Sequence, residues 1–127
     1  MSEKKLHDIN IDVQTSYISS SSEPEAARYV FAYSITIKNE GSIEAQLMSR
    51  HWVITDANGK VQEVRGEGVV GEQPHIEPDQ SFQYTSGSVI ETSVGAMQGS
   101  FQFIDSNGDT FDVTIKPFSL SIPRTLH

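Results

Sequence analysis

The chain has 127 residues, a length that suits one domain, and its formal net charge of −8 combines 9 basic with 17 acidic residues. Its lysines and arginines are too few and too scattered to neutralise the phosphates of a nucleic acid or of an anionic membrane surface. No apolar run approaches the ~20 residues of a membrane helix, and no apolar segment follows Lys4 and Lys5, so we expect neither a membrane span nor a secretory signal. Cysteine is absent, which excludes disulfides, thiolate metal ligands and cysteine nucleophiles. Together these features predict a cytoplasmic protein.

Apolar and polar residues alternate in most segments of the chain. This pattern of period two predicts strands, in chain order, in the segments INIDV (9–13), YVFAYSITI (29–37), SFQYT (81–85), SFQF (100–103) and TFDVTI (110–115). Such alternation is typical of strands that are buried on one face only, as in antiparallel sheets. No helical periodicity extends over a long segment, so we predict an all-β protein.

Two hairpins are marked by Asn-Gly pairs between apolar segments, at Asn58-Gly59 and Asn107-Gly108. Asn-Gly is favoured in tight hairpin turns because both residues accept positive φ angles. About seven to eight short strands with frequent turns predict an antiparallel β-sandwich of the fibronectin type III or immunoglobulin-like kind. The absence of cysteine excludes the disulfide-linked immunoglobulin variant, and Trp52 is expected to pack in the core. We predict one domain over residues 1–127, with a folded core at roughly 8–120 and flexible tails.

The segment GEGVVG contains Gly66, Gly68 and Gly71 in the G-x-G-x-x-G spacing of dinucleotide-binding loops. In those folds the glycines follow a strand and open a helix, whose N-terminus meets the pyrophosphate. Here Pro74 and Pro78 break any helix within one turn, and the charged residues around the glycines are acidic apart from Arg65. We therefore reject a dinucleotide-binding fold and expect the glycines to shape a sharply bent loop.

Two smaller ligand sites stay open as alternatives. Successive glycines can turn backbone N–H groups toward an anion, such as pyrophosphate or a nucleotide phosphate, and Arg50, His51 and Arg65 would supply the positive charge. His75 lies near carboxylates in the sequence and is a candidate ligand for a weak divalent-metal site, although the histidines lack the spacing of known metal motifs. No cofactor motif and no serine nucleophile elbow is present, so we predict a non-enzymatic protein without a cofactor.

Three segments together resemble the bacterial ApaG family. They are RHWVITDANGKVQEVRGEGVVGEQP (50–74), FQYTSG (82–87) and GSFQF (99–103). The resemblance covers nearly the whole chain and is loosest at the N-terminus and in the serine-rich segment 19–27. The chain departs from the family pattern at Asp79, where glycine is common, and at Ser88, where cysteine is often found.

The resemblance implies a fibronectin type III-like sandwich and no established enzymatic activity. In this family the gene commonly neighbours that of a diadenosine tetraphosphate hydrolase, and the family is associated with cobalt and magnesium tolerance. Similar domains occur in eukaryotic F-box proteins and in a polymerase delta-interacting protein, where an interaction role is inferred. The resemblance thus favours an interaction role over catalysis.

The sequence therefore predicts a binding module that engages an unidentified protein partner, because a glycine- and proline-rich loop mounted on a sheet is a common recognition surface. The candidate surface is the glycine-rich loop with the adjoining strand ends: Arg50, His51, Arg65, Gly66, Gly68, Val69, Val70, Gly71, Gln73 and Pro74. If Val69 and Val70 are exposed they form a docking patch, and if they are buried they anchor the loop. The alternatives are anion binding at this loop and divalent-metal sensing through His75. Pairing of sandwich edge strands between copies would also give a homodimer.

Overall fold

The computed structural model describes residues 4–123, which form eight strands and two single-turn 3₁₀ helices. The strands are β1 (Ile9–Tyr17), β2 (Tyr29–Asn39), β3 (Ala45–Asp56), β4 (Val61–Glu67), β5 (His75–Ile76), β6 (Ser81–Ile90), β7 (Val94–Asp105) and β8 (Thr110–Ser121). The helices are η1 (Ser19–Ser21) and η2 (Pro24–Ala26). The prediction of flexible tails falls largely on residues 1–3 and 124–127, which lie outside the described range. Within that range, no helix is both long and apolar enough to cross a membrane.

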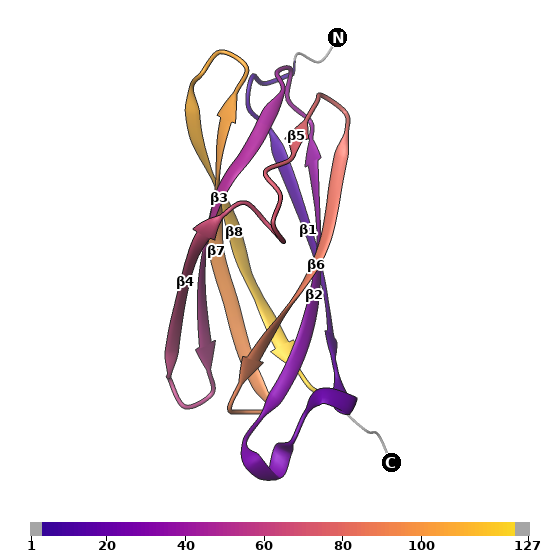
Figure 1. Cartoon of the computed structure of the whole chain (residues 1–127), viewed down its shortest axis with the longest axis vertical. Helices are drawn as coiled ribbons and strands as arrows, with labels where there is room; N and C mark the ends of the chain where they lie inside the picture. Colours follow the sequence, from indigo (N-terminus) through magenta and orange to yellow (C-terminus); the bar gives the residue numbers. More distant parts are fainter. Residues whose placement is uncertain (1–3, 124–127) are drawn as a thin grey trace.

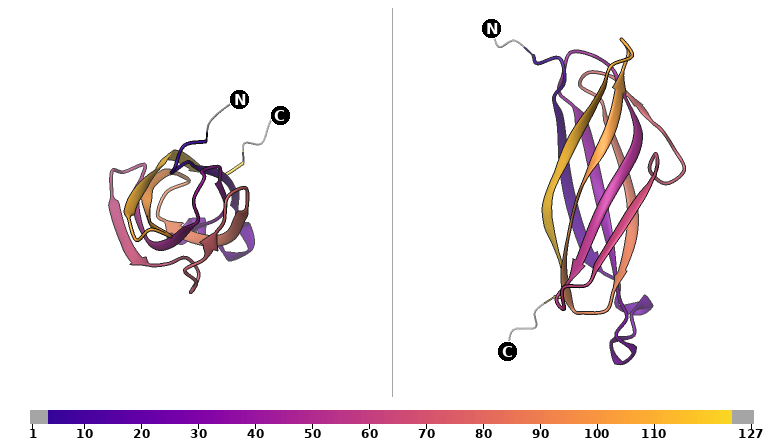
Figure 2. Two further views of the ribbon diagram at one scale, coloured as in Figure 1. Left: turned by 90° about the horizontal axis from the view of Figure 1, so that it is seen from above. Right: turned by 90° about the vertical axis from the view of Figure 1, so that its left-hand side faces the viewer.

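Two antiparallel sheets face each other along the long axis of the molecule (Figure 1). One sheet has the order β1-β2-β6, and the other has the order β4-β3-β7-β8, with the short β5 paired to the start of β3. Seen from above, the strands wrap around a common core with a ring-like outline (Figure 2). The structure thus confirms the predicted all-β antiparallel sandwich.

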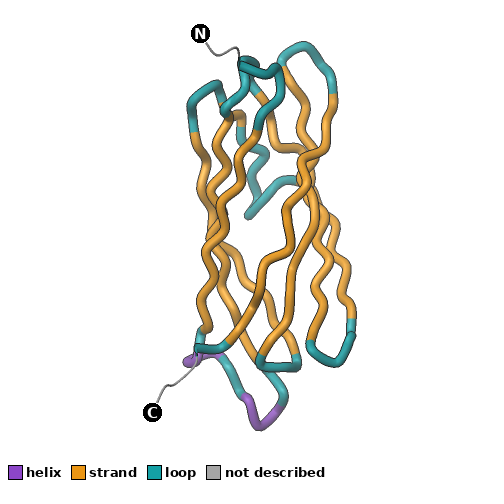
Figure 3. Tube along the Cα trace, turned by 180° about the vertical axis from the view of Figure 1, so that it is seen from behind, coloured by secondary structure: helices purple, strands orange, loops and turns teal. Residues whose placement is uncertain are grey.

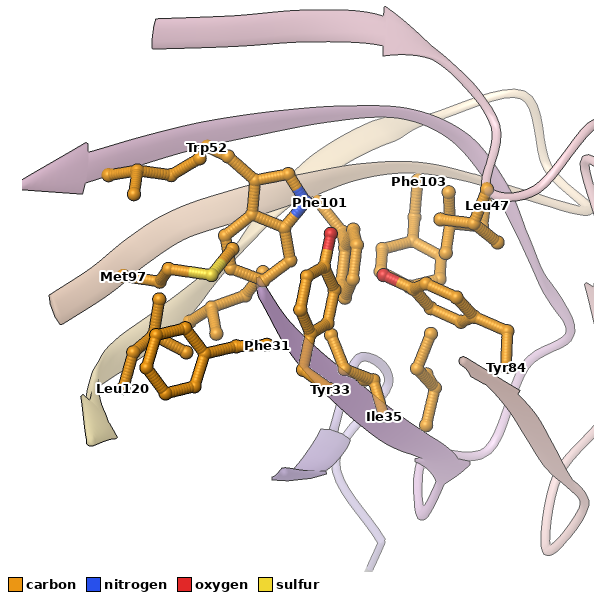
Figure 4. Packing of buried hydrophobic residues seen from close by; sticks show 14 of the residues in the cluster. Phe31, Tyr33, Ile35, Leu47, Trp52, Tyr84, Met97, Phe101, Phe103 and Leu120 are labelled. Carbon is orange, nitrogen blue, oxygen red and sulfur yellow. The ribbon is translucent and has the colours of Figure 1, made fainter. Parts of the chain in front are cut away.

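The predicted alternation matches the observed burial. In β2 the odd-numbered residues from Phe31 to Ile37 are buried, while the residues between them are partly exposed. Trp52 is buried as predicted, and its ring packs 5.5 Å from that of Tyr33 in the facing sheet and 6.1 Å from that of Phe101 (Figure 4). Aromatic side chains from both sheets therefore meet at the centre of the sandwich.

Both Asn-Gly hairpins form, but the expectation of two positive φ angles in each was wrong. Only the glycines have positive φ, 83° at Gly59 and 87° at Gly108. A preceding aspartate explains the difference, because its Oδ1 accepts the N–H groups two and four residues further along the chain. The distances are 2.9 and 2.9 Å for Asp56, and 2.8 and 3.0 Å for Asp105. This bonding favours a type I turn that ends in a left-handed glycine.

Asp105 also ties the N-terminal segment to the sandwich. Its Oδ2 lies 2.7 Å from Nε2 of His7, whose ring stacks on Phe111 with centroids 3.8 Å apart. The hydrogen bond with His7, followed by those from the backbone N–H groups of Asp109 and Asn107, lowers the pKa of Asp105 below its usual value. Since the folded pKa is the lower one, this stabilisation is complete above the unfolded pKa of about 4 and is lost as the pH falls through the folded pKa.

We expect Asp105→Asn to lower the urea midpoint of unfolding at pH 7. The difference from the wild type should shrink as the pH falls from about 4 through the lowered pKa of Asp105, because the folded wild-type carboxylate then becomes protonated and loses its advantage. Urea denaturation at a series of pH values measures this, with Asp112→Asn as the control, since Asp112 is exposed on the same hairpin. A difference that is constant with pH would contradict the role of the ionised carboxylate.

Asp79, where the chain departs from the pattern that it resembles, lies in a tight turn. The N–H of Gln80 donates to the carbonyl of Glu77 at 2.9 Å, with Pro78 and Asp79 as the central residues. Asp79 has a φ of 69°, the region that glycine enters freely and that aspartate tolerates better than most residues. Its carboxylate also pairs with Nζ of Lys4 at 2.8 Å. The turn therefore forms with aspartate at this position.

Candidate functional site

The glycine-rich loop, residues 66–74, leaves the end of β4 and crosses the side of the sandwich toward β5. In Figure 3 it is the loop segment that dips toward the middle of the molecule, and in the right-hand view of Figure 2 it stands out from one side. The dinucleotide-type arrangement is absent here, because β4 is followed by this loop and β5 rather than by a helix. Val69 is 0% exposed and belongs to the hydrophobic core, so the loop also helps to close the sandwich.

An irregularity in β3 anchors both ends of the loop. The pairing of β3 with β7 shifts register at Met48. The carbonyl of Met48 accepts the N–H of Gly68 at 2.8 Å and Nε2 of Gln73 at 2.9 Å. Beside it, the N–H of Leu47 donates to the carbonyl of Pro74 at 3.0 Å. The loop is therefore mounted on a rigid strand at two points.

The tip of the loop is a two-residue turn in which both residues have positive φ. Val69 and Glu72 exchange N–H to carbonyl hydrogen bonds of 2.8 and 2.9 Å, and they enclose Val70 and Gly71 with φ angles of 44° and 80°. Valine is an outlier in this region, because its branched Cβ crowds the backbone. Val70 is 54% exposed, in contrast to the buried Val69. One valine therefore anchors the loop and the other projects from it.

The three glycines of the motif have three different roles. A Cβ on Gly68 would lie 2.1 Å from the carbonyl oxygen of Glu72, so the backbone passes too close for any side chain. A Cβ on Gly66 would lie 2.7 Å from Nη1 of Arg50, so glycine makes room for the guanidinium. At Gly71 the space is open, and only its positive φ favours glycine.

The structure separates the basic residues that the sequence grouped together. Arg50 lies under the loop and donates from Nη1 to the carbonyls of Glu67 and Gly68, at 3.1 and 2.8 Å. His51 and Arg65 both contact Oε1 of Glu63, at 2.7 and 3.1 Å, on neighbouring strands. The hydrogen bond with His51 and the charge of Arg65 lower the pKa of Glu63.

The backbone N–H groups that an anion site would use are largely engaged within the protein. Those of Gly68, Val69 and Glu72 all donate to backbone carbonyls. A shallow hollow of about 260 Å³ lies beside them, lined by Glu67, Gly71, Glu72 and Gln73. Two carboxylates in this lining disfavour an anion and favour a basic or neutral group from a partner.

His75, the metal-ligand candidate, lies at the start of β5 and pairs with one carboxylate. Its Nδ1 is 2.7 Å from Oε1 of Glu44. Across residues 4–123, no three side chains of His, Cys, Asp or Glu gather in a way that would hold a metal ion. Two protein ligands at an exposed position would bind a divalent cation only weakly.

Sequence reasoning missed two residues close to this region. Met48 supplies the carbonyl that holds the loop, but no sequence pattern marks a β-bulge at this position. Tyr84 is in the buried phase of β6, and its hydroxyl has no hydrogen-bond partner within the described range. Burial raises the pKa of Tyr84 far above its usual value. The alternation predicted that the ring would be inside, but it carried no information about the hydroxyl.

Comparison with known proteins agrees with this fold and loop. The sequence profile described as the ApaG domain matches residues 19–105, which include the whole loop. Proteins named Protein ApaG from Thiobacillus denitrificans and Azoarcus sp. are 55% and 54% identical over 127 residues, covering 100% of this chain and of each relative. A solved structure of an ApaA protein from Bordetella pertussis has a TM-score of 0.93 and 46% identity, covering 96% of this chain and 99% of that one. The chain therefore belongs to the ApaG domain family.

Proposed function

We propose that this protein is a non-enzymatic cytoplasmic binding module that engages another protein through the loop 66–74. The conformation of Val70 carries the proposal. A valine gains about 1.5–3 kcal/mol when it is fully buried, and a left-handed conformation costs an L-residue roughly 1–2 kcal/mol. Val70 is 54% exposed and has a φ of 44°, so it lacks much of the gain and bears the cost. Strain of this kind is typical of positions that serve recognition rather than folding.

The mounting of the loop supports the same role. Its two anchor points on β3 hold the tip in one conformation, so that little ordering entropy is lost when a partner binds. Glu67 and Glu72 are exposed and lie three residues before and two residues after the projecting Val70 in the chain. A complementary partner surface would therefore offer an apolar contact for Val70 with basic groups around it.

The substitution Val70→Asn tests this role separately from folding. Asparagine accepts positive φ and Asn-Gly is the preferred pair for this turn, so we expect the free energy of unfolding to rise by about 1 kcal/mol. Binding of the partner is expected to fall at the same time, because the apolar contact is lost. Urea denaturation measures the first effect, and quantitative co-purification with the tagged chain measures the second.

The matched control is Val94→Asn, at a valine that is also exposed but begins β7, far along the chain from the loop. Proteins that co-purify with the wild type and with the control, but not with the more stable Val70→Asn variant, would be partners of the loop. Equal recovery by all three chains would contradict the proposal.

An amide NMR titration separates the protein-binding role from the small-ligand alternatives. Saturable shifts confined to residues 65–73 with pyrophosphate would replace the proposal with an anion site. Saturable shifts around His75 with magnesium would instead support a metal-sensing role, in line with the metal-tolerance association of the family. Because only two protein ligands would hold the metal, any magnesium-induced shifts around His75 are expected to saturate only at a high magnesium concentration.

A further inference from the structure

β4 has a regular strand edge that no other strand covers. It pairs with β3 on one side only, and it lies at the left margin of the molecule in Figure 1. Its pairing with β3 has no register shift, and its sequence, VQEVRGE, contains neither proline nor lysine. Unpaired N–H and C=O groups on such an edge can pair with a strand of another chain.

The other sheet edges are blunted or bridged. β8 carries Lys116 and Pro117, opposite the register shift between Met97 and Gly99 of β7. Proline, lysine and bulges are the features that protect edge strands from pairing. The C-terminal end of β6 is bridged to the turn between β3 and β4 by the ion pair of Lys60 with Glu91. β1 lies beside β8, with a hollow of about 350 Å³ between them. Gln62 of β4 also reaches the C-terminal end of β6, because its Nε2 donates to the carbonyl of Val89 at 3.5 Å. From Glu63 to Glu67, however, β4 has no proline, lysine or register shift, so this part of β4 is the least protected edge.

The side chains of β4 are also suited to self-pairing. Val61 and Val64 are 57% and 38% exposed. On the outer face, Glu63 and Arg65 carry opposite charges on either side of Val64, the middle of the seven residues of the strand. An antiparallel partner centred on Val64 would place each of these charges opposite its complement.

We propose that a second copy of this chain pairs with β4, antiparallel, about a two-fold axis at Val64. In this register all seven residues of β4 have a partner, Glu63 faces Arg65 of the other copy, and Arg65 faces its Glu63. Opposite charges in directly facing positions stabilise a strand pair, and like charges destabilise it. Moving the axis to Glu63 or to Arg65 would place that residue opposite itself, which selects the register on Val64.

The expected strength of this dimer follows from the surface area that the strand pairing buries. Pairing through one seven-residue strand buries much less than the roughly 1,200–2,000 Å² of a standard stable interface. We therefore expect a reversible dimer whose population rises with protein concentration. This dimer does not depend on the role proposed for the loop, and the tests below do not use partner binding.

Disulfide trapping tests the register. The chain has no cysteine, so a single introduced thiol reports one contact. Directly facing Cα atoms in an antiparallel pair are about 4.5–5.5 Å apart, within the range that a disulfide bridges. We expect Val64→Cys to form a covalent dimer on mild oxidation. Val61→Cys is the control, because the two copies of Val61 would lie roughly 20 Å apart along the pair. Trapping about tenfold faster at position 64 supports the register, and equal rates would overturn it.

Charge reversal tests the complementarity between copies. Glu63→Arg and Arg65→Glu each create facing like charges, so each variant alone is expected to self-associate about tenfold more weakly than the wild type in sedimentation equilibrium. A mixture of the two variants restores both facing pairs and is expected to form a heterodimer. Both side chains are exposed, and thermal melting verifies that each variant is folded. Wild-type chains that stay monomeric at millimolar concentration, or variants that fail to associate when mixed, would overturn the proposal.

Discussion

Gly68→Ala is expected to lower the free energy of unfolding by about 3 kcal/mol, from two separate costs. A left-handed φ, here 61°, costs alanine roughly 1–2 kcal/mol. The new Cβ would also stand 2.1 Å from the carbonyl oxygen of Glu72. That contact forces the backbone apart at the Val69–Glu72 pair, and overpacking of this kind typically costs roughly 1–3 kcal/mol.

Urea denaturation followed by the fluorescence of Trp52, the only tryptophan, measures this loss. Gly71→Ala is the matched control, because its φ of 80° carries the same conformational cost while nothing lies within 4 Å of the new Cβ. We expect the control to lose only about 1 kcal/mol. Equal losses at the two positions would show that the close approach of the backbone contributes nothing.

Trp52→Ala is expected to lower the free energy of unfolding by about 3–5 kcal/mol, the usual cost of removing a large buried aromatic side chain. Its ring lies 5.5 Å from that of Tyr33 and 5.9 Å from that of Phe118, and it packs edge-on against Phe101. Its removal therefore leaves a cavity where the two sheets meet. Domains are stable by only about 5–15 kcal/mol, so a large fraction of the total would be lost.

Far-UV circular dichroism in urea measures this effect, since the substitution removes the fluorescent probe. Trp52→Phe keeps an aromatic ring between the sheets and is expected to retain most of the stability. A Trp52→Ala variant within about 1 kcal/mol of the wild type would mean that the surrounding rings collapse into the vacated space.

Trp52 and Gly68 have different roles in neighbouring parts of the protein. The aromatic centre around Trp52 joins the sheets, whereas Gly68 shapes a loop mounted on one of them. A variant such as Gly68→Ala should therefore combine lower stability with a displaced Val70. Val70→Asn should instead combine higher stability with weaker partner binding. The two loop variants are therefore expected to change the free energy of unfolding in opposite directions.

Features that depend on local chemistry were determined by the sequence itself. Period two placed the residues of β2 on the correct faces, because side chains alternate across any extended strand. Pro74 and Pro78 ruled out a helix after the glycines, because proline cannot occupy a helix interior. The hairpin positions were correct as well, since Gly59 and Gly108 each have the positive φ that a reversing chain requires.

Only the tertiary structure decided which residues of the candidate site anchor the loop and which are exposed. Val69 and Val70 are adjacent and chemically identical, and which one is buried depends on where Met48 holds the loop against β3. Arg50 was a candidate anion ligand, yet it donates to the loop carbonyls because it is the direct partner of Gly66 in the β3–β4 pairing. The exposed edge of β4 likewise follows from the order of strands in the sheet. Each of these outcomes depends on contacts between segments distant in the chain, which no local pattern of residues encodes.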